Sequence, residues 1–557
     1  MNALCVAVKT YGPQFHQGNL RRRVLSNQPA ADFVQPCSPM RRARACKASL
    51  APALCFPFCC PPGQLRATPR VPELTHSAAP RPSWESNSAR LLPPHSPGGI
   101  SLSLPASERA NEAAAGTAVG SRDGLPGKPW GSEKSYLIPA LEIIGFNAAL
   151  NLFNRAYFGC CDPDVTLSSI WRNLKASWVT DDSTFTVNQL GHPYQGSMYH
   201  GFARASGLNY WEGLGYSFAG SLLWEIAGEK TPPSRNDLVT TSIGGSLLGE
   251  ALFRIANLWL EQGKAPRLWR ELGAAAISPP VGFNRFAFGQ FRTIFPSNKP
   301  LYYGSIEIGA ASATLDGPAP NRHVERAEAA ARFALEYGLP GGNVYAYDRP
   351  FDYFSFEVSA ATGIGLDTLM TTGLLLGTSY GGVYYRGIWG VYGSYDYIMP
   401  EVFRFASTAL ALGTTSAWRL TPSLALNATA LAGLGYAAVS DIRDVENERA
   451  NHYGLAPQAA LALRLIMGDK AFDLSTRGYF LGDMSSGPRG GDDEVLHAAA
   501  ALTWRLHREH AISLRYQVSR READSPDLGG RTQKRETVGI YYSMILGDRR
   551  FGLGGWR

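Results

Sequence analysis

The C-terminal half of the chain alternates apolar and polar side chains, and this period of two restricts the fold most strongly. The alternation is clearest in segments 351–360, 383–397, 496–507, 512–518 and 537–544. Polar turns separate segments of about ten residues, the length that crosses a bilayer at a tilt. Strands of soluble proteins are usually shorter, about five or six residues. The pattern therefore favours an antiparallel β-barrel that spans a membrane.

We place this barrel in residues 281–557 and expect about ten to twelve strands, from the typical strand length of such barrels. A soluble sandwich or lipocalin-like barrel also alternates and is the competing interpretation. In the membrane interpretation, the polar faces of the strands line the interior of the barrel. The residues expected there are Glu357, Arg386, Asp396, His497, Arg505 and Arg515.

Residues 134–280 lack this alternation and are predicted to form a helical domain. We expect helices over Leu137–Phe158, after Pro193, over Trp211–Glu229 and from about Leu238 to Glu261. Proline is tolerated in the first turn of a helix, where its missing N–H leaves no hydrogen bond unmade. No stretch of eighteen or more residues is continuously apolar and free of charge, so a conventional membrane-spanning helix is not expected. The fold class is therefore α+β, a helical domain followed by a barrel.

The fourth expected helix carries two local signals. Ser234 and Asp237 have the spacing of a capping box at its start. Gly245 and Gly249 lie four residues apart, on one face, where they allow another backbone to approach closely. We expect these glycines to mark a tight helix contact.

Residues 1–133 are rich in proline, alanine, serine and arginine and show neither the periodicity of a helix nor that of a strand. Such a composition buries too little apolar area to offset chain entropy, so a disordered leader is expected. Within it, the basic stretch Met40–Lys47 precedes the apolar run Ala48–Cys60, which resembles an export signal. We expect translation to start at Met40; a tail that contains an apolar run by chance is the alternative.

The net charge of +7 is concentrated in this leader, which has fifteen Lys and Arg against seven Asp and Glu. The remaining chain is then close to neutral, at −1, which gives little support to nucleic-acid binding. Six of the eight cysteines also lie in the leader, and Cys160 and Cys161 are the others. Without a CxxC pair or a spaced Cys/His array, neither a zinc module nor a disulfide framework is predicted.

The helical domain holds the candidate functional residues His192, His200, Arg204, Glu225 and Glu229. Glu225 and Glu229 are like charges at i and i+4, and Glu229 lies near a helix C-terminus, where the helix dipole also disfavours an anion. This double penalty suggests a compensating partner: an arginine such as Arg204, a histidine or a metal ion.

Three interpretations of these five residues remain open. They form hydrogen bonds and ion pairs that satisfy buried polar groups. Alternatively, His192 or His200 is a general base oriented by Glu225 or Glu229, with Arg204 stabilising an anion. The third interpretation is a metal site, although the spacing matches no strong signature. The chain has no GxSxG elbow and no nucleotide-binding fingerprint.

Five long motifs in order resemble one uncharacterised bacterial family, the domain of unknown function 3943. They are KSYLIPALEIIGFNAALNLFNR, TLSSIWRNLKASWV, NQLGHPYQGSMYHGFARASGLNYWE, LLWEIAGEKTPPSRNDLVTTSIGGSLLGEALFR and ISPPVGFNRFAFG, between about Lys134 and Phe288. GIWGVYGSYDY also resembles the barrel part of longer members. The resemblance implies an exported envelope protein of Gram-negative bacteria and brings no known activity, cofactor or catalytic residue.

Together these patterns predict an outer-membrane protein whose helical domain faces the periplasm and packs on or plugs the barrel. Its expected role is structural, or the binding of a small solute or lipid, with membrane lipid as a partner and no cofactor. The alternative is a membrane-embedded lipid-modifying hydrolase or acyltransferase that uses the His/Glu/Arg residues. Whether the protein is an enzyme, and its oligomeric state, stay open at this stage. A single solvent-reached cleft holding all five residues would favour the enzyme.

Overall fold

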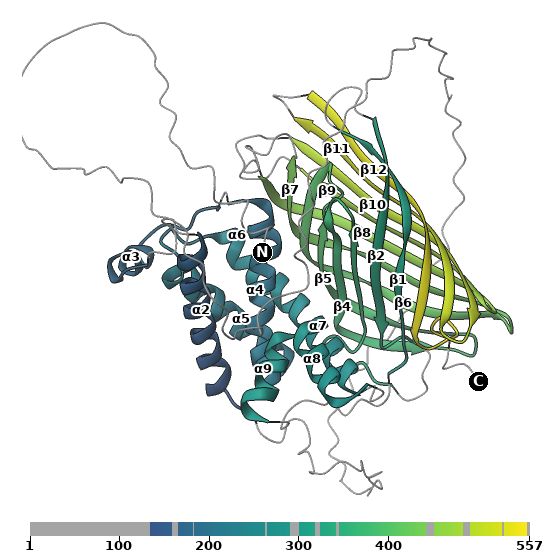
Figure 1. The fold of residues 1–557 in the computed structure, drawn as a ribbon, viewed down its shortest axis with the longest axis horizontal. Helices are drawn as coiled ribbons and strands as arrows, with labels where there is room; N and C mark the ends of the chain where they lie inside the picture. Colours follow the sequence, from purple (N-terminus) through teal and green to yellow (C-terminus); the bar gives the residue numbers. More distant parts are fainter. Residues whose placement is uncertain are drawn as a thin grey trace, which may run out of the picture. The chain divides into compact units, whose positions relative to one another are not determined.

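The computed structural model describes ten segments of the chain. They are residues 134–158, 165–181, 183–261, 265–289, 300–317, 323–340, 345–441, 451–482, 491–525 and 529–553. The predicted leader with its export signal, and the pair Cys160–Cys161, lie outside these segments. Within them, helices come first and strands follow, as the change of period predicted (Figure 1).

The helical domain consists of α-helices joined in two places by a π-helical turn. Its elements are α2 (Leu137–Phe158), α3 (Leu167–Asn173), η2 (Val187–Gly191), α4 (His192–Ala205), α5 (Tyr210–Ala227), α6 (Arg235–Val239), η3 (Thr240–Gly244), α7 (Gly245–Glu261), α8 (Arg267–Ile277) and α9 (Pro279–Phe288). The predicted first helix has the bounds of α2. The predicted fourth helix is a continuous run of α6, η3 and α7, which begins at Arg235 because the Ser234 hydroxyl accepts the N–H of Asp237 at 3.2 Å.

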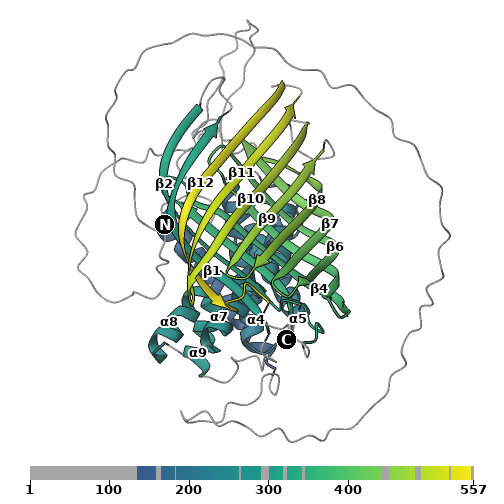
Figure 2. The same ribbon diagram turned by 90° about the vertical axis from the view of Figure 1, so that its right-hand side faces the viewer.

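The described strands form one closed antiparallel barrel of twelve, which confirms the predicted ten to twelve. They are β1 (Tyr302–Asp316), β2 (His323–Tyr337), β3 (Phe354–Ala361), β4 (Gly365–Gly381), β5 (Tyr385–Ile398), β6 (Phe403–Thr421), β7 (Leu424–Asp441), β8 (Asn451–Met467), β9 (Lys470–Leu481), β10 (Asp492–His507), β11 (His510–Ser525) and β12 (Gly529–Gly547). Each strand pairs with its neighbours in sequence, and β12 closes on β1 (Figure 2). In this pairing Ala310 lies opposite Ile540. Closure leaves no unpaired sheet edge.

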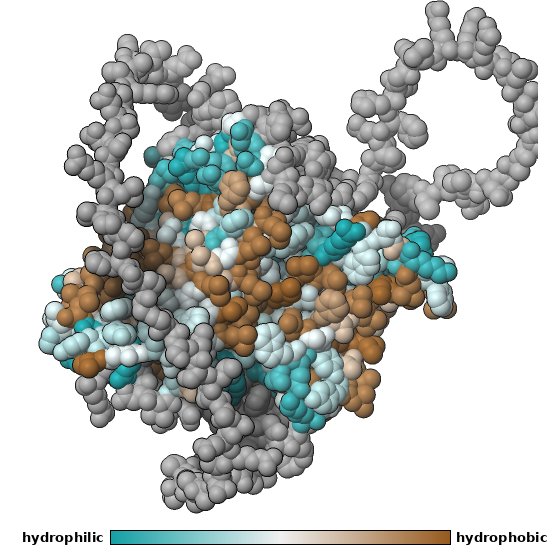
Figure 3. All heavy atoms as spheres, turned by 180° about the vertical axis from the view of Figure 1, so that it is seen from behind, coloured by the Kyte–Doolittle hydropathy of each residue, from teal (hydrophilic) through white to brown (hydrophobic). Residues whose placement is uncertain are grey.

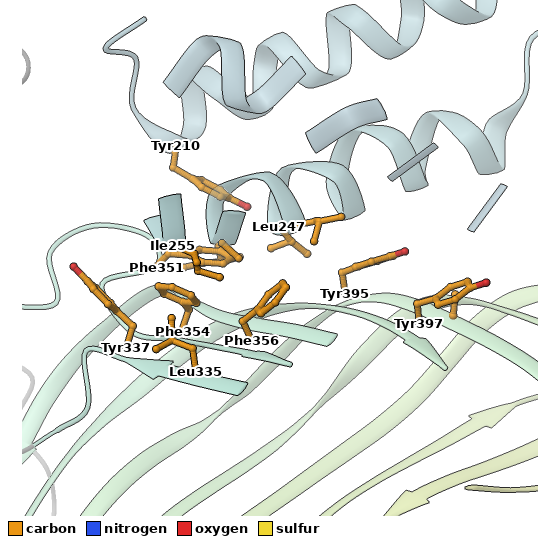
Figure 4. Packing of buried hydrophobic residues seen from close by; sticks show 14 of the residues in the cluster. Tyr210, Leu247, Ile255, Leu335, Tyr337, Phe351, Phe354, Phe356, Tyr395 and Tyr397 are labelled. Carbon is orange, nitrogen blue, oxygen red and sulfur yellow. The ribbon is translucent and has the colours of Figure 1, made fainter. Parts of the chain in front are cut away.

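The period of two separates an outer and an inner face along every strand. On β5, Asp396 points inward, where Arg477 and Tyr479 of β9 reach its carboxylate. Its neighbours Tyr395 and Tyr397 point outward, toward the helices (Figure 4). Many other outward side chains are apolar and exposed: Ile308, Leu412, Leu434, Leu455, Phe472, Leu496, Leu502, Ile512, Leu514, Val538 and Ile540.

The helical domain packs against this outer face of the barrel. Leu247 and Ile255 of α7 and Phe185 belong to one buried apolar cluster with outward side chains of β2, β3 and β5 (Figure 4). Gly393 of β5 allows the close approach, because a Cβ there would lie 2.5 Å from Leu247 Cδ2. Because the outward set makes these contacts and the inward set does not, they favour packing on the barrel over plugging it.

An aromatic stack extends this contact at the connection between β2 and β3. Phe351 adopts a left-handed backbone conformation (φ 64°) and is fully buried. Its ring stacks on Tyr210 of α5 with 5.7 Å between centroids. A non-glycine residue in this region is strained, so the surrounding packing must offset the strain.

Inside the helical domain, the two glycines of α7 allow α4 to cross closely, as predicted. A Cβ on Gly245 would lie 2.6 Å from the Cα of Gly196, and one on Gly249 would lie 3.0 Å from the Cα of Ser197. Any side chain at Gly245 would therefore force the two helices apart. This crossing brings the polar residues of α4 against those of α7.

α2 meets the length and composition of a membrane span over Leu137–Ala156, and only 17% of that span is buried. The sequence-based expectation that no such helix exists was too strict, since it required a run without any charge. Glu142 and Arg155 are the charged residues of the span. Glu142 lies on the side of α2 that faces α9, where its carboxylate accepts a hydrogen bond from Asn284 at 2.8 Å, and Arg155 near the end of the helix donates to the carbonyl of Val165 at 3.2 Å.

Candidate functional site

Glu250 of α7 is the centre of a fully buried ionic cluster. Its carboxylate accepts hydrogen bonds from Arg204 Nε at 2.6 Å and from Arg254 Nε at 2.8 Å. His200 Nε2 lies 3.0 Å from the same carboxylate. The Glu250 side chain has no exposed surface, and those of Arg204 and Arg254 are 3% exposed. Charge-assisted bonds of this kind offset the desolvation of the buried charges.

Arg254 connects this cluster to the barrel through two hydrogen bonds. Its Nη1 lies 3.3 Å from the carboxylate of Asp352, and its Nη2 donates to the carbonyl of Pro350 at 2.7 Å. Both acceptors lie in the connection between β2 and β3. The cluster thus joins α4, α7 and the barrel in one hydrogen-bonded unit.

His192 belongs to a second buried group, at the start of α4. Its Nδ1 lies 3.1 Å from the hydroxyl of Thr241, and its Nε2 lies 3.9 Å from the carboxylate of Asp237. Glu225 accepts the backbone N–H of Ser234 at 2.7 Å through one oxygen. Its other oxygen is buried without a hydrogen-bond partner.

Glu229 has local partners. Its carboxylate accepts hydrogen bonds from Trp224 Nε1 at 2.7 Å and from the Thr231 hydroxyl at 3.1 Å. Glu225 of α5 and Glu229 just after it therefore accept hydrogen bonds from neutral donors. Arg204, one of the partners that the sequence suggested for them, pairs with Glu250 instead, because α4 presents it to α7.

The five predicted residues thus divide between the two buried polar groups. His200 and Arg204 belong to the group around Glu250, and His192 and Glu225 belong to the other, with Glu229 nearby. Glu250, the partner of Arg204, was not among these five residues. Its i, i+4 spacing to Arg254 predicts the ion pair that the structure has. No group of three or more His, Cys, Asp and Glu that could hold a metal ion occurs among the described residues.

The interior of the barrel holds the larger polar site. A cavity of about 170 Å³ is lined by charged side chains that include Glu307, Arg332, Glu357, His497 and Arg515. Three of these, Glu357, His497 and Arg515, were predicted to face the interior. Asp396, a fourth, lines a smaller cavity beside it. Arg386 and Arg505, also predicted, line neither of these two cavities.

Ion pairs cross the interior between distant strands. Arg464 of β8 bonds to Glu336 of β2 at 2.5 Å, and Arg477 of β9 bonds to Asp396 of β5 at 2.8 Å. Arg332 bonds to Glu357 of the neighbouring strand at 2.7 Å. These pairs fix inward side chains in the middle of the barrel, where an open channel would hold water.

Apolar side chains fill the barrel on either side of these ion pairs. One cluster lies at the end where β1 begins and β12 ends, and it includes Tyr303, Tyr392 and Phe551. The other lies where β5 ends and β6 begins, and it includes Leu315 and Phe405. The interior is therefore a packed core with a small cavity.

Residues 177–280 match the model of the Domain of unknown function (DUF3943). The match runs from the segment before η2 into α9 and so covers both buried polar groups. It confirms the resemblance that the sequence motifs indicated. No curated protein matches the chain.

Among solved structures, the chain is similar to three outer-membrane proteins. The NanC porin is 10% identical over 42% of this chain and 98% of its own, with a TM-score of 0.21. The channel DcaP of Acinetobacter baumannii is 10% identical over 45% and 99%, with a TM-score of 0.22. An outer membrane channel from Pseudomonas putida F1 is 10% identical over 45% and 100%, with a TM-score of 0.24.

Proposed function

We propose that this chain, which carries the domain of unknown function in its helical part, is an outer-membrane protein with a closed barrel that anchors the helical domain. The exposed outer wall of the barrel supports the membrane location. Its outward side chains, such as Ile308, Leu514 and Ile540, are apolar and at least half exposed. A soluble barrel would leave these side chains in water, which is unfavourable for so large a contiguous apolar surface.

The packed interior carries the proposal that the barrel is an anchor and does not conduct. Arg464 and Arg477 bond to carboxylates on distant strands, and apolar layers lie on both sides of them. The remaining cavity of about 170 Å³ is smaller than the roughly 300–1,000 Å³ of typical small-molecule sites. A structural role with lipid as the main partner therefore fits better than passage or storage of a solute in the barrel.

Among the described residues, His192 and His200 line neither of the two cavities above, which gives the lipid-modifying enzyme no support. His200 is buried against Glu250, and His192 is buried beside Thr241 and Asp237. A general base must reach the proton it abstracts, directly or through one water. Both imidazoles instead face buried protein groups, so we assign the two polar groups to helix–helix cohesion.

Electrical recording in planar bilayers tests the closed barrel. We expect the purified full chain to insert without stable open-channel current. A variant with Arg464→Ala and Arg477→Ala removes two cross-barrel pairs and is expected to flicker open more often. Ile540→Ala on the outer wall is the matched control and is expected to behave as the native chain. A steady ohmic current through the native protein would show that the barrel is a pore.

Cell fractionation tests the membrane location independently. We expect the native chain in the outer-membrane fraction, with a mobility in gel electrophoresis that changes on heating, because closed barrels resist unfolding in detergent. Recovery in the soluble fraction would contradict the proposal. Sequencing the N-terminus of the mature protein would in addition locate the cleavage that the apolar run Ala48–Cys60 predicts.

A further inference from the structure

The helices α2 and α5 turn large apolar side chains outward. On α2, Leu137, Leu141, Ile144 and Leu152 are 55–67% exposed, and Arg155 near its C-terminal end is exposed as well. The opposite side of α2 carries the buried Ile143 together with hydrogen-bonded polar side chains. Asn151, for example, donates to the carbonyl of Gly228 at 2.9 Å. A helix on the surface of a water-soluble protein shows the reverse arrangement.

α5 repeats this arrangement. Its outer side chains include Trp211 and Phe218, which are 46% and 48% exposed. Its inner side carries Ser217, whose hydroxyl donates to the carbonyl of Gly196 at 3.1 Å, and the buried Glu225. Two neighbouring helices therefore turn hydrogen-bonded polar residues toward other parts of the helical domain and large apolar side chains away from it.

The length of α2 matches the apolar layer of a bilayer. The span Leu137–Ala156 has 20 residues, which corresponds to about 30 Å at a rise of about 1.5 Å per residue. The hydrocarbon core of a bilayer is also about 30 Å thick. In that environment, every buried polar group of a helix bundle must find a protein partner. The ion pairs around Glu250 and the hydrogen-bonded Asn147 and Asn151 of α2 meet this requirement, whereas one carboxylate oxygen of Glu225 does not.

Exposed apolar side chains occur both on the helices and on the barrel. Figure 3 shows hydrophobic residues spread over the middle of one face of the molecule. The helical domain covers the outward face of β5 around Tyr395 and Tyr397, and outward side chains are exposed elsewhere, as at Trp389 of β5 and Leu412 of β6. The part of the wall that would meet lipid is thus next to the bundle.

We propose that the outward faces of α2 and α5 contact lipid hydrocarbon, so that the helical domain lies in the membrane beside the barrel. This inference rests on the proposed outer-membrane location of the barrel. It replaces the sequence-based expectation of a periplasm-facing domain, because apolar faces of this length are unfavourable in water. The alternatives are that a second copy of the chain, or a segment of this chain outside the described residues, covers the outward faces of α2 and α5.

Collision of spin labels with oxygen and with a nickel complex distinguishes lipid from water and from protein. The full chain, with its eight cysteines replaced, is labelled at Leu141→Cys or Phe218→Cys and placed in phospholipid vesicles. Ile540→Cys on the barrel wall is the lipid reference, and Lys230→Cys, at an exposed charged position after α5, is the water reference. We expect the labels at Leu141 and Phe218 to collide with oxygen and not with nickel, as at Ile540.

Each other outcome contradicts the inference in a recognisable way. If the labels at positions 141 and 218 collide with the nickel complex while the label at position 540 collides only with oxygen, the helices lie in water and the barrel alone lies in the membrane. Protection of both labels from both agents would show that protein covers them. Nickel access at Ile540 as well would overturn the membrane location itself. Heat-modifiable mobility of each labelled variant verifies that the barrel has folded.

Discussion

Tyr395 of β5 donates a hydrogen bond from its hydroxyl to the backbone carbonyl of Gln189, 2.5 Å away in the helical domain. The next residue, Asp396, points to the other side of the same strand and bonds to Arg477 inside the barrel. Two consecutive residues of β5 thus make different contacts. Tyr395 bonds to the helical domain, and Asp396 bonds to Arg477 in the barrel interior. The alternation of a β-strand makes this division possible.

Replacing Tyr395 with phenylalanine tests the contact between the barrel and the helices. The change leaves the buried carbonyl of Gln189 without this donor, which is expected to cost about 1–3 kcal/mol. Unfolding by urea in detergent micelles, followed by tryptophan fluorescence, measures the loss. Tyr384→Phe, at a side chain that is 67% exposed, is the control and should change stability little. Equal stability of the two variants would show that the bond contributes nothing.

Glu250→Gln tests whether the buried cluster holds the helical domain together. Without the carboxylate charge, Arg204 and Arg254 stay buried with less compensation, and the expected loss is about 3–5 kcal/mol. Limited proteolysis of the helical domain and urea unfolding both report it. Glu494→Gln, an exposed position on β10, is the matched control. If both variants resisted protease equally, the cluster would not be the cohesive element proposed here.

Gly245→Ala tests the close crossing of α4 and α7. The added Cβ would lie 2.6 Å from Gly196 Cα, so the helices must shift, at an expected cost of about 1–3 kcal/mol. Gly215→Ala on α5 is the matched control, because a Cβ there meets nothing within 4 Å. That change is expected to stabilise the helix by roughly 0.5–1 kcal/mol. The two midpoints of urea unfolding should therefore move in opposite directions; movement in the same direction would count against the crossing.

The pair Arg477–Asp396 provides a double-mutant cycle inside the barrel. Arg477→Met leaves the buried Asp396 carboxylate with only Tyr479 and should destabilise by about 3–5 kcal/mol. Adding Asp396→Asn should recover part of this loss, with an interaction energy of about 0.5–3 kcal/mol. The partly exposed pair Lys534–Glu536, treated in the same way, should give less than about 1 kcal/mol. An interaction energy of Arg477–Asp396 no larger than that of Lys534–Glu536 would mean that the interior is hydrated and open.

Patterns that act over a few residues predicted most of the fold. A run almost free of helix breakers indicated α2 with its observed bounds. The change of period indicated that strands follow helices, although α9 (Pro279–Phe288) extends past the expected boundary at residue 281. The four-residue spacing of Gly245 and Gly249 indicated the close crossing with α4. These features depend on helix and strand periodicity and on local sterics, which a single sequence displays directly.

The pairings of the candidate site depended on tertiary structure. Arg204 has its partner in Glu250, 46 residues further along the chain, and Arg464 has its partner in Glu336, 128 residues earlier. Such contacts exist only after helices cross and a barrel closes. Residue type and spacing could therefore identify buried charges that need partners but could not identify the partners.

The sequence by itself determined that the strands have two chemically different faces and that the helices must pack on something. Only the tertiary structure decided that the helices pack on the outer face, at Tyr395 and Tyr397, and that ion pairs such as Arg477–Asp396 fill the inner one. The physical reason is that alternation specifies which side chains share a face. What covers each face depends on barrel closure and on the position of the helices, which no local pattern contains.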